Sequence, residues 1–211
     1  MEKKSKNKAV KSGIFIAVFV LSIMIIGVSV SYAYFSANVV GSSDTGENQA
    51  DKLNVTTTLT SGGAINATSL AIIDGSEYLT KAEHFEFTVT NNTDSTVRAK
   101  YAINLTDITI SKNILSKYFK WAIVVNSDTS NAITGDFQDA SLATEGNSDT
   151  TTVTIDSKAL VSEEDALELD IGATDTLTFY LWLENDDNVD QLYLTNGNMT
   201  AKLSLDAFPV R

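Results

Sequence analysis

The chain contains no cysteine, one proline and one histidine among its 211 residues. The absence of cysteine excludes disulfide bonds and a lipid-modified cysteine anchor, so the fold must be stabilised by its own apolar core. The single histidine, His84, excludes zinc motifs that need two histidines and leaves a Ser-His-Asp triad dependent on that one residue. The sequence also lacks a glycine-rich phosphate-binding loop. We therefore expect a protein that is not an enzyme, and we name no catalytic residue.

Positive charge is scarce outside the first 33 residues. Those residues carry five lysines and one glutamate, so the remainder holds ten basic and 26 acidic side chains, a formal charge of −16. Because so few basic groups could neutralise phosphates, nucleic acid is excluded as a partner. The acidic excess keeps an exported protein soluble at high local concentration, and it favours cations or basic surfaces as partners.

The N-terminal segment has the layout of an export signal. The lysine-rich "MEKKSKNKAVKSG" precedes an uncharged run from Ile14 to Val30. Ser31 and Ala33 then form a small-residue cleavage site, with Tyr34 as the first residue after the cut. The alternative is an uncleaved transmembrane helix over residues 14–35. The uncharged run alone falls slightly short of the roughly 20 residues that span a bilayer core, and adding residues 31–35 makes it long enough. In both cases the lysines keep the N-terminus inside and the remainder is exported.

Two-residue alternation of apolar and polar side chains dominates the rest of the chain and predicts β-strands. The runs 85–90 and 97–105, separated by the turn residues "NNTD", predict a hairpin or an adjacent pair. The run 176–185 is apolar on both faces, which indicates a central strand covered on both sides. Short helices are expected at 111–117 and near 162–166, and residues 126–150 are expected to form a polar surface excursion. The remaining predicted strands are 53–59, 117–125, 151–155, 166–171 and 199–208.

About seven or eight strands with one proline and no strong helix indicate an all-β protein, a jelly-roll or Greek-key β-sandwich. The chain divides into a signal peptide or membrane anchor (1–33), an extended segment with a flexible linker (34–52), and the sandwich domain (53–211). The linker contains "GSSDTGENQADK", which has no large apolar side chain.

Two further patterns are candidates for binding. Asp186, Asn188 and Asp190 have the alternate spacing of a calcium loop, but Gln191 stands where an EF-hand needs glycine. An acidic turn between strands explains this spacing, and a weak surface Ca²⁺ site is the alternative. Tyr180, Trp182 and Tyr193 could form a carbohydrate-binding platform or could belong to the core. We expect no other cofactor.

The segment "SYAYFSAN", after its lysine-led apolar run, resembles the signal region of the TasA/camelysin (CalY) family, whose members are exported bacterial proteins processed by the signal peptidase SipW. The strand-turn-strand run "LTKAEHFEFTVTNNTDSTVRAKYAINL" and the closing strands "TLTFYLWLEND" and "NMTAKLSLDAFPV" are also similar to that family. The resemblance implies a secreted jelly-roll subunit of extracellular biofilm-matrix fibres. In such fibres the N-terminal segment of one copy is donated as a strand to its neighbour.

Carried over to this chain, the donated strand is Tyr34 to Val40, with Tyr34, Phe35, Ala37 and Val39 as its apolar residues, and the acceptor is the sandwich from Leu53 onward. The implied partners are further copies of the chain, other matrix proteins and the signal peptidase, with the membrane involved only through residues 14–35 before cleavage. The metallopeptidase activity assigned to camelysin-type members does not carry over, because this chain has one histidine. The alternative function is a membrane-anchored surface or adhesion domain, which requires residues 14–35 to remain uncut.

Overall fold

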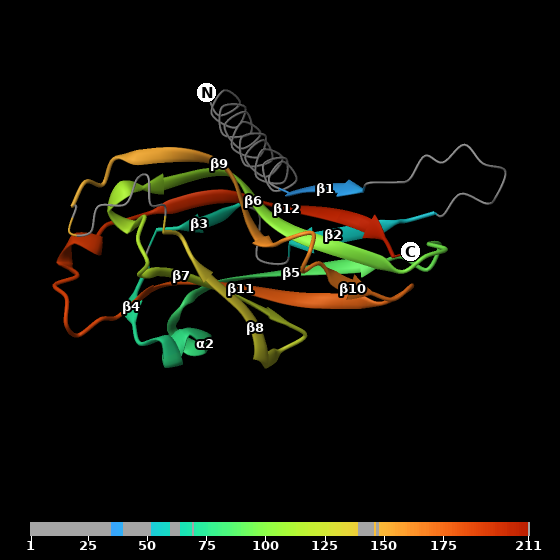
Figure 1. Cartoon of the computed structure of the whole chain (residues 1–211), viewed down its shortest axis with the longest axis horizontal. Coiled ribbons are helices and arrows are strands. Elements are labelled where there is room, and N and C mark those ends of the chain that lie inside the picture. The colour runs from blue at the N-terminus through green and yellow to red at the C-terminus, as the bar shows by residue number, and fades with distance from the viewer. Residues whose placement is uncertain are drawn as a thin grey trace, which may run out of the picture.

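The computed structural model describes residues 35–39, 52–59, 64–68, 70–138, 146 and 148–210. In this part of the chain, twelve strands form two six-stranded sheets packed face to face (Figure 1). This confirms the all-β sandwich. The predicted leader and its cleavage residues Ser31, Ala33 and Tyr34 lie outside the described residues. None of the helices within these ranges combines the length and apolar character needed to cross a membrane.

The first sheet, sheet A, is built around the long strand β6, which has β12 on one side and both β9 and β10 on the other. The outer edge of β12 is covered by β3 and then by β1. All pairs in this sheet are antiparallel except β1 with β12, which is parallel. Its strands are β1 (Phe35–Val39), β3 (Ile65–Ala67), β6 (Ala99–Ser111), β9 (Thr152–Val161), β10 (Leu167–Leu169) and β12 (Met199–Pro209).

The second sheet, sheet B, has the order β2-β5-β11-β7-β8, with β4 added parallel to the end of β11. The short helices lie in the connections: η1 and α2 precede β5, η2 follows β6, and η3 precedes β12. The strands of sheet B are β2 (Val55–Leu59), β4 (Ile72–Ile73), β5 (Glu83–Asn91), β7 (Phe119–Val125), β8 (Asp128–Asp136) and β11 (Thr174–Glu184). The helices are η1 (Gly75–Glu77), α2 (Tyr78–Lys81), η2 (Lys112–Ile114) and η3 (Leu192–Leu194).

The core fills the space between the sheets, because the inward positions of the long strands are apolar at every second residue. One polar tie crosses it: the Tyr101 hydroxyl on β6 donates to Asp175 on β11 at 2.6 Å. Burial is the main cause that raises the pKa of Tyr101, and the bond to Asp175 is the second, so the hydroxyl remains a donor. The largest fully buried side chains include Phe87, Tyr101, Ile103, Phe119 and Phe179.

The predicted central strand is confirmed as β11. On its inner face Leu177 and Phe179 are fully buried. Its outer face carries Tyr180 and Trp182, on which Tyr78 of α2 packs. The apolar residues on both faces of this strand are therefore explained by one core on each side.

The predicted hairpin of 85–90 with 97–105 is wrong, because β5 and β6 lie in different sheets. The buried Asn91 amide donates to the main-chain oxygens of Val97 and Leu169, at 3.1 and 3.3 Å, where the chain crosses from one sheet to the other. Each run has one apolar face, and both apolar faces are buried because the two strands face each other across the core.

Two other local expectations also fail. Part of the predicted surface excursion is strand β8, joined to β7 by Asn126 and Ser127, whose φ angles of 51° and 62° suit a two-residue hairpin turn. An exposed edge strand needs no apolar alternation, so the sequence pattern missed it.

The helix expected near 162–166 is absent. The cap contact forms there, since Asp165 N donates to the Ser162 hydroxyl at 3.2 Å, but it closes a turn and not a helix. The strand count exceeds seven or eight because β8 and the short strands β3 and β4 were not predicted, and because β1, expected as a donated strand, pairs within its own chain.

Candidate functional site

Strand β1 is an added strand on the edge of β12. Its parallel register places Phe35 opposite Leu203, Ala37 opposite Leu205 and Val39 opposite Ala207. These three β12 residues belong to the buried core. The apolar positions of the predicted donor segment are therefore in phase with the buried positions of β12, while Tyr34 lies outside the described residues.

This edge of β12 is covered in two parts. Antiparallel β3 pairs with Met199–Ala201, and β1 pairs with residues 203–207. Strand β1 also lies against β2, the edge strand of sheet B, so it sits at the seam where the two sheets meet (Figure 1). Without β1, the main-chain groups of β12 that face the seam would lack ladder partners, which makes this edge a template for another strand.

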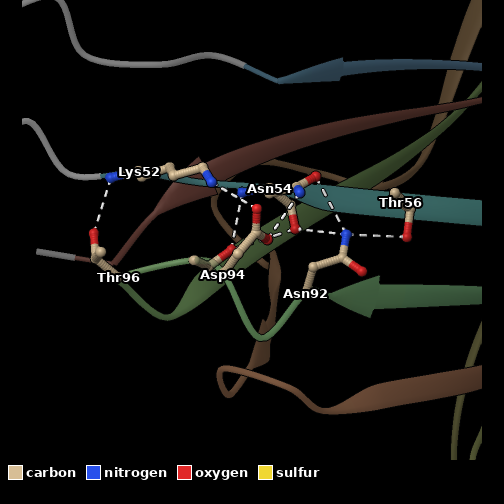
Figure 2. Close-up of polar contacts among 7 residues, drawn as sticks. Lys52, Asn54, Thr56, Asn92, Asp94 and Thr96 are labelled. Atoms are coloured by element: carbon tan, nitrogen blue, oxygen red, sulfur yellow. Dashed lines mark hydrogen bonds and ion pairs between the residues drawn. The ribbon is translucent and has the colours of Figure 1, made fainter.

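A network of polar contacts holds the residues before β2 to the turn after β5 (Figure 2). The Lys52 ammonium lies 2.6 Å from one carboxylate oxygen of Asp94, and the Asn54 amide donates to the other at 2.9 Å. Thr96 N donates to Lys52 O, and Lys52 N donates to the Thr96 hydroxyl, both at 2.9 Å. We name this network the polar clasp; its members are Lys52, Asn54, Thr56, Asn92, Asp94, Ser95 and Thr96.

The polar clasp fixes the place where the N-terminal arm, which we define as β1 with residues 40–51, joins the sandwich. Hydrogen bonds from Lys52 and then Asn54 lower the pKa of Asp94, so its carboxylate stays charged. The Lys52–Asp94 pair is exposed and contributes little by itself, so the main-chain bonds give the clasp its rigidity. The sequence marked "NNTD" as a turn, but its partners lie about 40 residues earlier and no local pattern connects them.

The predicted calcium residues lie in the loop between β11 and η3. A carboxylate oxygen of Asp186 accepts from Asn188 N at 3.0 Å, and this bond is the main cause that lowers the pKa of Asp186. Asp190 accepts from Leu192 N at 3.0 Å. These oxygens stabilise turns of their own loop. Within the described ranges no group of three or more His, Cys, Asp or Glu side chains could hold a metal ion, and the Ca²⁺ site stays a prediction.

The lone histidine lies near the start of β5, where its ring is 5.8 Å from that of Tyr180. His84 and Glu86 are both exposed on this strand. Their neighbour Glu83 is half-buried, and its Oε2 atom is buried without a hydrogen bond inside the described part of the chain. Burial raises the pKa of Glu83, and the nearby His84 partly opposes this shift.

Glu83→Gln is expected to stabilise the protein at pH 7. The raised pKa means that the folded state disfavours the carboxylate, a cost that is present above the folded pKa and vanishes below the ordinary value of 4.5. Because the side chain keeps contact with solvent, we expect the melting temperature to rise by only about 1–2 °C. Thermal melts at pH 7 and pH 3.5 check this, with the exposed Glu86→Gln as the control. A gain at pH 3.5 equal to that at pH 7 would contradict the assignment.

The three aromatic residues of the predicted carbohydrate platform do not share one surface. Tyr180 and Trp182 gather on the outer face of sheet B with Tyr78, which the sequence analysis did not single out. Tyr193 lies on η3 and packs against the main core. The tyrosine that completes the cluster comes from α2, a four-residue helix without a sequence pattern of its own.

Comparisons with known proteins assign no family. No family model matches the chain, and no curated protein matches it. Among solved structures, the chain is similar to an exo-β-1,3-galactanase from Phanerochaete chrysosporium, crystallised with galactose, at 17% identity and a TM-score of 0.26. The match covers 74% of this chain and 29% of the galactanase chain. A superposition this poor supports no conclusion about this protein.

Proposed function

We propose that the chain is a secreted structural subunit of extracellular biofilm-matrix fibres, whose copies assemble by exchanging the N-terminal strand β1. The observation that carries the proposal is the parallel pairing of Phe35–Val39 with the edge of β12 at the seam between the sheets. The resemblance of the N-terminal region to the TasA/camelysin family implies the same role for the segment from Tyr34 to Val40.

Strand exchange is favoured by the way β1 is attached. Residues 40–51, twelve in all, separate it from Lys52 at the polar clasp. A chain of that length can reach roughly 40 Å, which is far enough to enter a neighbouring copy. The clasp belongs to the sandwich and not to the arm, so the base of the arm stays fixed while β1 pairs with either copy.

The energetic balance supports exchange at high concentration. The ladder with β12 is the same whether β1 comes from its own copy or from a neighbour, so exchange gains little pairing energy by itself. A tethered arm has an effective concentration on the order of millimolar, which favours the closed monomer in dilute solution. Assembly is therefore expected where the exported protein accumulates, and the many bonds of a growing fibre then hold it together.

Export supplies a natural start for assembly under this proposal. Before cleavage the segment 34–40 is continuous with the apolar run 14–30, which ties it to the membrane. A cut after Ala33 would release the arm outside the cell. Signal peptidase is then a required partner, and copies of the same chain are the main one.

The test is the N-terminus and the assembly state of the exported protein. N-terminal sequencing should find Tyr34 first, and the purified chain 34–211 should form filaments that electron microscopy detects. Exported protein that still carries the lysine-rich leader would favour the membrane-anchored surface domain. Chain 34–211 that remains monomeric at high concentration would also contradict the proposal.

A further inference from the structure

A surface cavity of about 450 Å³ opens on the outer face of sheet B. It lies between β7, β8 and the end of β11 on one side and η1 with α2 on the other. The volume falls within the range of small-molecule sites, roughly 300–1,000 Å³. The side chains that give it its chemistry are Tyr78, Lys120, Thr134, Asp136, Trp182 and Glu184.

One wall of the cavity is aromatic and held in place. The rings of Tyr78 and Trp182 stack with centroids 4.9 Å apart and planes at 15°. The Trp182 indole N–H donates to Glu184 at 2.7 Å, and the other oxygen of Glu184 accepts from Gly75 N at 3.1 Å. A Cβ atom at Gly75 would lie 2.7 Å from the Glu184 carboxylate, so any other residue here would displace that carboxylate. The carboxylate thus joins η1 to β11 and fixes the stacked pair before any ligand binds.

The opposite wall is polar. The Lys120 ammonium on β7 lies 3.3 Å from Asp136 on β8, and both side chains are about one-third exposed. The ammonium has further protons to donate, and Asp136 and the Thr134 hydroxyl can accept. Lys120, Asp136 and Glu184 together give the lining a net negative charge.

We propose that this cavity binds a sugar ring of a neutral oligosaccharide. A pyranose has an apolar C–H face, which suits the Tyr78 wall, and a rim of hydroxyls, which suits Lys120, Asp136 and Thr134. A purely apolar ligand would leave the ion pair desolvated. A phosphate or a uronic acid would meet two carboxylates and a strongly acidic protein.

The cavity is independent of strand exchange. In sheet B the order β2-β5-β11-β7-β8 puts β8 at the edge opposite β2, where β1 lies. The cavity would therefore stay open in both the monomer and the fibre. If the chain is a fibre subunit, each copy would bring one sugar site to the polymer.

A titration followed by NMR tests the site. The chain has two tryptophans, Trp121 and Trp182, and both line this cavity, so both indole N–H signals report on it. Chain 34–211 is held dilute, where the tethered strand keeps it monomeric, and is titrated with β-1,4-linked tetrasaccharides of glucose, galactose, mannose and N-acetylglucosamine, and with tetragalacturonate. At least one neutral sugar should shift the Trp182 signal to saturation, and tetragalacturonate should not.

Variants separate a sugar site from a general surface effect. Tyr78→Ala and Lys120→Met should each weaken binding about tenfold or more, and Tyr78→Phe should retain it. Lys112→Met is the matched control, because Lys112 forms a similarly exposed ion pair with Asp149, at 3.2 Å, outside the cavity. If Tyr78→Ala disturbs the fold, Lys120→Met decides.

Three results would overturn the proposal: no saturable shift with any neutral sugar, equal binding of tetragalacturonate, or equal weakening by Lys112→Met and Lys120→Met. These results leave the fibre proposal untouched, because the titration does not depend on filament formation.

Discussion

A chain carrying Ser36→Cys and Ser204→Cys is expected to lose filament formation when it is oxidised as a monomer and to regain it on reduction. The two residues face each other in the β1–β12 ladder. Neighbouring strands lie about 4.8 Å apart, within the Cα separation that a disulfide bridges. The protein has no other cysteine, so this is the single disulfide that a monomer can form. Electron microscopy and electrophoresis without reductant measure the outcome.

The order of steps gives the same pair a second readout. If filaments form first and are then oxidised, the disulfide should join neighbouring copies, and covalent multimers should appear. Ser36→Cys with Thr200→Cys is the matched control, because Thr200 pairs with Asn66 of β3 and lies about 13 Å along β12 from Ser204. This control should polymerise under both conditions, and a chain lacking residues 34–40 should remain a folded monomer. Oxidised Ser36→Cys/Ser204→Cys monomers that polymerise normally would refute strand exchange.

Tyr101→Phe is expected to lower the free energy of unfolding by about 1.5–3 kcal/mol, the usual contribution of a hydrogen bond to a charged group. The Tyr101 ring is fully buried, and its hydroxyl supplies the tie to Asp175 in the opposite sheet. Asp175 keeps a bond from the Asn126 amide at 2.7 Å, so the variant should fold. Urea denaturation measures the loss.

The control for this prediction is Tyr118→Phe. The Tyr118 hydroxyl lies 3.3 Å from Asp186 in a surface loop, so its removal should cost about 0.5 kcal/mol. Asp175→Asn, alone and combined with Tyr101→Phe, completes a double-mutant cycle. The double variant should lose less stability than the sum of the losses of the two single variants. Equal losses of unfolding free energy in the Tyr101 and Tyr118 variants would show that the bond between the sheets stabilises the fold no more than a surface hydrogen bond does.

Strand positions were the most predictable part of the fold. The predicted runs 117–125 and 199–208 match β7 and β12 to within two residues at either end, because burial of one strand face leaves a two-residue period in the local sequence. Strands whose position is set by neighbours left no such period. The edge strand β8 is exposed along most of its length, and β4 contributes two residues to the end of β11.

The candidate sites were predictable to different degrees. The family resemblance implied a strand over Tyr34 to Val40, and the structure pairs Phe35–Val39 with β12 of the same chain. The polar clasp and the cavity on sheet B were not predictable, because each joins residues that are distant in the sequence. Lys52 meets Asp94, and Tyr78 meets Trp182, through contacts that no short motif encodes.

The sequence by itself determined the class of fold, since an apolar period of two, one proline and no cysteine permit little besides a sandwich held by its core. It also determined the strong acidity and the apolar character of the N-terminal strand. The tertiary structure alone decided which strands are neighbours, that β5 and β6 face each other across the core, and that β1 runs parallel to β12 at the seam between the sheets. The physical reason is that alternation records which face of a strand is buried, whereas main-chain hydrogen bonds are the same for every partner. Partner choice therefore depends on how all the strands fill one core together.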